Sequence, residues 1–173
     1  MRGSAVKLLG ALLVVAGAYA LGHIEACRRE RRVRELTASI SALTLLESHV
    51  VYGQCLLADA LRRVGEEHPE VKPPFLGAAR RLEEGCSASR AWREAIGAWS
   101  KGAALVDGDL VPLVQLAGIL GLSDAEDQAR HLRWAKSQLE TRLAAARERL
   151  PETARLCRAL GACGGLVLAL LLY

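Results

Sequence analysis

The chain has 173 residues, of which 51% are apolar, and its formal net charge is +4. That length accommodates one domain of ordinary size, and apolar content drawn from Leu, Ala and Val favours helices over a β-sandwich. Between residues 36 and 154, 16 acidic residues outnumber 14 basic ones. The basic excess therefore lies beside the two chain ends, which argues against nucleic-acid binding, because that function needs a basic face on the domain.

An uncharged run covers residues 8–24, and its 17 residues are close to the minimum for a membrane-spanning helix. Five arginines follow it: Arg28, Arg29, Arg31, Arg32 and Arg34. Basic residues mark the cytoplasmic side of a membrane helix. Residues 1–24 are therefore predicted to be a transmembrane helix, and residues 25–35 a basic juxtamembrane segment. The alternative is a signal peptide cleaved after Ala20, and the mass of the mature chain would distinguish the two.

Residues 36–154 are predicted to form a cytoplasmic, all-helical domain. Its first helix carries apolar residues at helical spacing, at Leu36, Ile40, Leu43 and Val50. Glu47 falls on the same stripe, where an unpaired carboxylate is costly to bury. It either lies at the edge of the stripe, pairs with an arginine of another helix, or makes a polar contact used in assembly.

The pattern resumes in a second helix at Leu56, Leu57, Ala60, Leu61 and Val64, and Gly65 is predicted to end it. A loop follows, after which Pro73 and Pro74 suit the first turn of a helix that closes at Gly85. The next helix places four apolar residues on one face: Trp92, Ala95, Ile96 and Trp99. A short apolar element then begins near Pro112.

The last helix of the domain has the clearest start signal. Ser123 and Glu126 match a capping box, and Asp124 and Asp127 add negative charge at the positive end of the helix dipole. The apolar stripe that follows contains Leu132, Ala135, Leu139, Leu143, Ala146 and Leu150. Trp134 lies off this stripe, so it is either exposed for a partner or covers its own bundle.

Residues 155–173 are predicted to be a C-terminal transmembrane or membrane-inserted helix, with Arg155 and Arg158 on its cytoplasmic side. Gly161 and Gly165 have the G-x-x-x-G spacing that lets helices approach closely. Ala18 and Gly22 repeat the small-x-x-x-small spacing in the first span. Either the two spans pack together or against a partner's helices, or small residues are simply common in such helices.

Chemistry-bearing motifs are scarce. The five cysteines have no paired spacing, and the acids near residue 124 lack the spacing and glycine of a calcium loop. The phosphate-binding loop motif of nucleotide hydrolases does not occur in the sequence. We therefore expect no cofactor, no metal site and no enzymatic activity.

Three stretches resemble the stage III sporulation protein AB family: LTLLESHVVYGQCLLADALRRVG, LGLSDAEDQARHLRWAKSQL and RALGACGGLVLALLLY. The positions that carry the family pattern are Glu47, Tyr52, Gly53, Gly121, Ser123, Asp124, Asp127, Gln128, His131 and Leu132. Leu56 and Ala58 stand where the family usually has prolines, and Cys157 where an aromatic residue is common. The resemblance covers nearly the whole chain.

The resemblance implies a membrane-anchored helical bundle, similar to the F protein of type II secretion systems, with a hydrophobic span at each end. It implies a component of the sporulation channel between mother cell and forespore, located in the outer forespore membrane on the mother-cell side. The implied partners are a stage III AA-type secretion ATPase and the other membrane proteins of the channel. The alternative is a secreted helical protein with a cleaved signal peptide and a C-terminal anchor.

Six residues of the predicted domain are candidates for docking the ATPase, because they are polar or are expected to be exposed. They are Glu47, Asp124, Glu126, Asp127, His131 and Trp134. An acidic patch at the start of the last helix would suit a basic partner.

Overall fold

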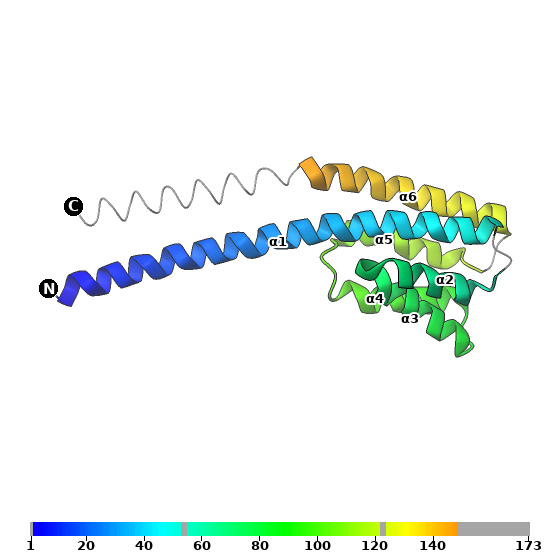
Figure 1. Ribbon diagram of the computed structural model, residues 1–173, viewed down its shortest axis with the longest axis horizontal. Coiled ribbons are helices and arrows are strands. Elements are labelled where there is room, and N and C mark those ends of the chain that lie inside the picture. Colours follow the sequence, from blue (N-terminus) through cyan, green and yellow to red (C-terminus); the bar gives the residue numbers. More distant parts are fainter. Residues whose placement is uncertain (1, 53–54, 122–123, 149–173) are drawn as a thin grey trace. The chain divides into compact units, whose positions relative to one another are not determined.

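The computed structural model describes residues 2–52, 55–121 and 124–148, and within these ranges every regular element is helical. Figure 1 shows the elements in chain order, and they confirm the all-α prediction. They are α1 (Arg2–Tyr52), α2 (Leu57–Glu67), η1 (Pro69–Val71), α3 (Lys72–Glu83), α4 (Ala88–Ser100), α5 (Asp107–Gln115), η2 (Leu116–Gly118) and α6 (Ala125–Glu148). Residues 31–146 form one compact unit, and residues 2–30 belong to a second unit.

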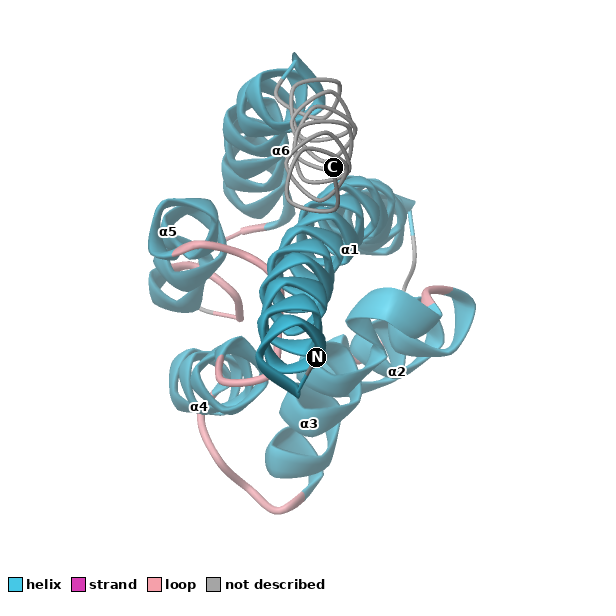
Figure 2. Cartoon of the chain, turned by 90° about the vertical axis from the view of Figure 1, so that its left-hand side faces the viewer, coloured by secondary structure: helices cyan, strands magenta, loops and turns pink. Residues whose placement is uncertain are grey.

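The core of the compact unit forms around α1. Figure 2 shows α2, α3, α4, α5 and α6 following one another around this helix. Leu36, Leu43 and Leu46 of α1 are fully buried or nearly so, and they belong to one apolar cluster with side chains from the surrounding helices. The stripe predicted from helical spacing therefore packs inward at Leu36 and Leu43, while Ile40 and Val50 are partly buried at its margin.

The apolar faces predicted for α4 and α6 are confirmed. Trp92, Ala95, Ile96 and Trp99 of α4 are all buried. Every described member of the predicted α6 stripe is buried as well, from Leu132 to Ala146. In both helices, residues spaced three or four apart lie on one face, because an α-helix has 3.6 residues per turn.

The prolines and the glycine that bound α3 also act as predicted. Pro73 and Pro74 lie in its first turn, where a missing N–H costs no helical hydrogen bond. At the other end Gly85 has a φ of 88°, a left-handed conformation that favours glycine. The N–H of Cys86 then donates to the carbonyl of Arg81 at 2.9 Å and closes the helix end.

Two expectations for α2 are wrong. Gly65 does not end the helix, which continues to Glu67. A Cβ at Gly65 would lie 3.1 Å from the Cβ of Phe75, so the glycine serves the close approach of α3. Leu56 precedes the helix and is 76% exposed, because the buried face of α2 begins only at Ala60.

The membrane spans remain predictions. None of the helices, over the residues that the structure describes, is both long and apolar enough to cross a membrane. Ala18 and Gly22 lie within α1. The predicted C-terminal span lies outside the described residues, together with Arg155, Arg158, Gly161 and Gly165.

Candidate functional site

The basic segment of α1 contributes directly to the packing of the compact unit. Arg32 binds Asp109 of α5 through two hydrogen bonds, of 2.7 Å from Nε and 3.0 Å from Nη2. Asp109 is fully buried and also accepts the backbone N–H of Val106 at the start of α5. These contacts raise the pKa of Arg32 above its ordinary value, chiefly through the hydrogen bond to Asp109. Arg32 is therefore a structural cation that joins two segments of chain 77 residues apart.

Arg31 has a second structural role. Its Nε donates to Glu35 at 2.8 Å, and its Nη2 donates to the carbonyl of Gly102 at 2.8 Å. The other oxygen of Glu35 accepts the N–H of Ala104 at 2.7 Å. Glu35 is buried, so the pair fixes the chain between α4 and α5 against α1.

The other three early arginines are placed differently. Arg29 pairs with Glu25 at 3.1 Å, one helical turn before it. Arg28 and Arg34 make no ion pair with any residue that the structure describes, and both are exposed. The sequence pattern predicts one topological role for all five arginines, but Arg31 and Arg32 also make structural contacts within the compact unit.

Glu47 links α1 to α6. Its carboxylate lies 3.1 Å from Nε of Arg133 and 3.5 Å from Nζ of Lys136. The side chain is 21% exposed, so it lies at the margin of the apolar stripe. The structure thus supports the alternative in which Glu47 pairs with an arginine of another helix.

Replacing Glu47 by glutamine is expected to lower the free energy of unfolding by about 1 kcal/mol, because two cations of α6 lose a partly buried anionic partner. Thermal unfolding of the full chain in detergent, followed by tryptophan fluorescence, measures the change. Glu140→Gln is the matched control, since Glu140 is an exposed residue of the same α6. Equal unfolding temperatures for the two variants would contradict the role of Glu47.

The acids at the start of α6 have three different roles. Asp124 is the residue before the helix, and its Oδ1 accepts the N–H of Asp127 at 2.7 Å. Asp127 pairs with Arg130 and lies 3.7 Å from Nε2 of His131. Glu126 is exposed and has no ion pair among the described residues. The helix is therefore capped by Asp124, one position later than the predicted Ser123, which lies outside the described residues.

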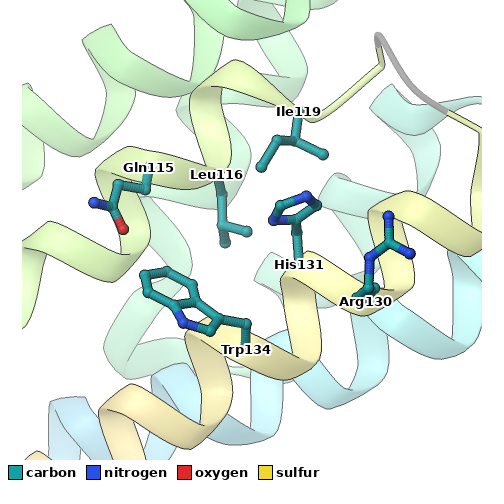
Figure 3. Close-up of a pocket in the computed structure, with 6 residues that line it drawn as sticks. All are labelled: Gln115, Leu116, Ile119, Arg130, His131 and Trp134. Carbon is teal, nitrogen blue, oxygen red and sulfur yellow. The ribbon is translucent and has the colours of Figure 1, made fainter.

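A largely apolar groove lies between α6 and the α5–η2 segment. Its volume is about 480 Å³, and it is lined by Gln115, Leu116, Ile119, Arg130, His131 and Trp134. Figure 3 shows the Trp134 and His131 rings, from α6, facing Leu116 and Ile119. Trp134 is 43% exposed, which confirms that it lies off the buried stripe. The sequence offered no signal for Gln115 and Ile119, because Gln115 ends the short α5 and Ile119 follows η2, so neither lies on a long periodic stripe.

A second surface, which we call the tip, combines the end of α1 with the start of α2 and the start of α6. Its exposed apolar residues are Val51, Tyr52 and Leu56, and Tyr52 is 86% exposed. A cavity of about 170 Å³ beside them is lined from all three helical segments, for example by His49, Leu57 and Gln128.

Gly121 holds the chain against this cavity before α6 begins. Its φ of 74° favours glycine, and an added Cβ would lie 2.9 Å from the Cβ of Ala88. Both the conformation and the close contact therefore require a residue without a side chain. This gives a physical reason for the glycine in the LGLSD stretch.

No group of three or more His, Cys, Asp or Glu side chains among the described residues is arranged to hold a metal ion. Hydrogen bonds and ion pairs within the chain already occupy most of the polar candidates.

Comparison with known proteins assigns the family. The family model for stage III sporulation protein AB matches residues 7–173. Stage III sporulation protein AB of Bacillus subtilis (strain 168) is 29% identical over 172 residues, which cover 96% of this chain and 99% of the relative. A solved structure of stage III sporulation protein AB superimposes with a TM-score of 0.64 at 25% identity, covering 69% of this chain and 96% of that one. The chain therefore belongs to the stage III sporulation protein AB family.

Proposed function

We propose that this chain is a non-enzymatic membrane component of the mother cell–forespore sporulation channel, and that it docks a secretion-type ATPase of the stage III AA type. The family match over residues 7–173 is the observation that carries the proposal, because it implies a role in sporulation. The match includes both hydrophobic ends as well as the helical middle. The protein would work by contact, in association with the other membrane proteins of the channel.

Membrane anchoring is part of the proposal and is supported by an uncharged run at each end of the sequence, residues 8–24 and 159–173. Residues 8–24 carry no charge, and the exposed cations Arg28 and Arg34 follow them. Because basic residues stay on the cytoplasmic side, the compact unit would face the mother-cell cytoplasm from the outer forespore membrane. The ATPase would be reached from the same compartment.

We assign ATPase docking to the tip. Tyrosine is among the residues that supply most of the affinity of protein interfaces, and Tyr52 is the most exposed large apolar residue described in the compact unit, followed by Leu56. Asp124 precedes α6 and Glu126 lies in its first turn, both beside Ala125, which lines the cavity of the tip. A partner with basic residues around an apolar patch would therefore fit this surface. The groove at Trp134 is the competing surface.

The test is capture of the purified stage III AA-type ATPase by the detergent-solubilised full chain. Tyr52→Ala and Glu126→Lys are expected to weaken capture about tenfold each, since interface anchors and charges at their rim contribute on this scale. Asp124→Asn removes a charge but keeps the helix cap, because asparagine caps as well as aspartate. Charge reversal at Asp124 or Asp127 is avoided, since it would also break the contacts that start α6.

Two controls make the outcome specific. Glu140→Lys reverses an exposed charge elsewhere on α6, and Trp134→Ala removes the main aromatic ring of the groove. Both are expected to capture the ATPase normally. Capture lost only with Trp134→Ala would move docking to the groove, and no capture by the unmodified chain would refute the adaptor role.

A further inference from the structure

An open polar cleft lies where the basic segment of α1 meets η1, α3 and the end of α4. Its volume is about 510 Å³, within the range of small-molecule sites. We call it the basal cleft. The residues of its lining that matter here are Arg31, Arg34, Glu35, Glu70, Pro73 and Trp99. All of them belong to the compact unit.

Two of the four charged residues that line the basal cleft, Arg31 and Glu35, form an ion pair with each other. Arg31 donates to Glu35 at 2.8 Å, and both side chains are held by the backbone between residues 102 and 104. This pair forms a fixed wall. Because Glu35 is buried and fully engaged, it is not available to a ligand.

The other two charged residues of the basal cleft are not paired. Arg34 and Glu70 are both exposed, and neither forms an ion pair with the other or with another described residue. Opposite charges that do not neutralise each other across a cleft suit a ligand that carries both signs. Trp99 and Pro73 also line the cleft and add apolar surface, although Trp99 is largely buried in the core.

The position of the cleft arginines along the chain indicates where such a ligand would come from. Arg31 and Arg34 follow the uncharged run of residues 8–24 by 7 and 10 residues, two to three helical turns of α1. If the anchor of the proposed function holds, on which this step rests, the basal cleft opens near the lipid headgroups. An ethanolamine headgroup combines a phosphodiester anion with a primary ammonium, which matches one arginine and one carboxylate.

We propose that the basal cleft binds the headgroup of an ethanolamine phospholipid, with Arg34 binding the phosphodiester and Glu70 the ammonium. A glycerol headgroup offers Glu70 no cation. A choline headgroup offers a quaternary ammonium that donates no hydrogen bond to the carboxylate. The cleft therefore selects the primary amine among common phosphodiester headgroups.

Native mass spectrometry of the full chain, released from maltoside micelles with one added lipid at a time, tests the selection. Phosphatidylethanolamine is expected to occupy the protein at least about threefold more than phosphatidylcholine or phosphatidylglycerol. Glu70→Gln is expected to remove this preference, and Arg34→Ala to lower the occupancy of all three lipids, because each loses one charge-assisted contact. The matched controls are Glu66→Gln and Arg63→Ala, exposed residues of α2 outside the cleft.

Competition with soluble glycerophosphoethanolamine separates a lipid from a free zwitterion. Displacement of bound phosphatidylethanolamine supports the headgroup site, whereas binding of the soluble compound without any lipid preference overturns the assignment to lipid. Equal occupancy by the three lipids, or an unchanged preference in Glu70→Gln, overturns the proposal. Because ATPase capture is measured separately on the same variants, failure of the cleft and failure of the adaptor role give different results.

Discussion

Replacing Arg32 by alanine is expected to lower the free energy of unfolding by about 3 kcal/mol, because it leaves the carboxylate of Asp109 buried without its cation. Asp109 is fully buried, and the two hydrogen bonds from Arg32 are its only contacts with a charged group described in the structure. Removal of one partner of a buried pair costs far more than the pair contributes as a whole. For a compact unit of this size, the loss corresponds to an unfolding temperature lower by about 10 °C.

Arg28→Ala provides the matched control for this experiment. Arg28 lies in the same basic segment and is exposed, so its loss should change stability by less than about 0.5 kcal/mol. Thermal unfolding of the full chain in detergent, followed by the fluorescence of the buried Trp92 and Trp99, reports on the compact unit. If Arg28→Ala and Arg32→Ala unfold at the same temperature, the basic segment has no structural part in the compact unit.

The simultaneous change of Arg32 and Asp109 to leucine refines the interpretation. Apolar residues of similar size often replace a buried ion pair with little loss, so the double variant should recover part of the stability lost in Arg32→Ala. Recovery should be incomplete, because Asp109 also accepts the N–H of Val106. An unfolding temperature below that of Arg32→Ala would indicate that the arginine's packing, rather than its charge, is what matters.

The sequence was sufficient to predict features whose cause is local. Apolar residues at helical spacing predicted the buried faces of α4 and α6, and prolines predicted the start of α3. Each of these depends on residues within a few turns of one another. The same reasoning identified Trp134 as lying off the buried face, because its angular position on the helix follows from its number alone.

Contacts between distant segments could not be predicted in this way. No pattern near Arg32 indicates Asp109, which lies 77 residues later. The sequence therefore predicted only a topological role for the arginine cluster. Gly65 looked like a helix end because glycine usually interrupts helices, but its reason is the approach of Phe75 from α3. The candidate groove likewise depends on η2, whose short 3-10 geometry leaves no periodicity to detect.

Trp92→Ala is expected to be the most destabilising single change in the compact unit, with a loss of about 4 kcal/mol. Trp92 is almost fully buried in the middle of the core, and its ring meets that of Phe75 edge to face, with centroids 5.2 Å apart. The indole Nε1 also donates to the carbonyl of Leu113 at 2.6 Å. That carbonyl lies in the last turn of α5, where carbonyl groups lack N–H donors from the same helix. The indole therefore fills the core and also supplies a hydrogen-bond donor to the end of α5.

Trp92→Phe separates these two contributions, because phenylalanine keeps an aromatic ring in the core but cannot donate to Leu113. We expect a loss of about 2 kcal/mol, most of it from the buried carbonyl that loses its partner. Trp134→Ala is the control, since the exposed Trp134 should cost less than about 1 kcal/mol. Urea unfolding of the full chain in detergent, followed by circular dichroism, should rank the variants as Trp92→Ala, then Trp92→Phe, then Trp134→Ala. If Trp92→Phe is as stable as the unmodified chain, the bond to Leu113 contributes nothing, and only the volume of the ring matters.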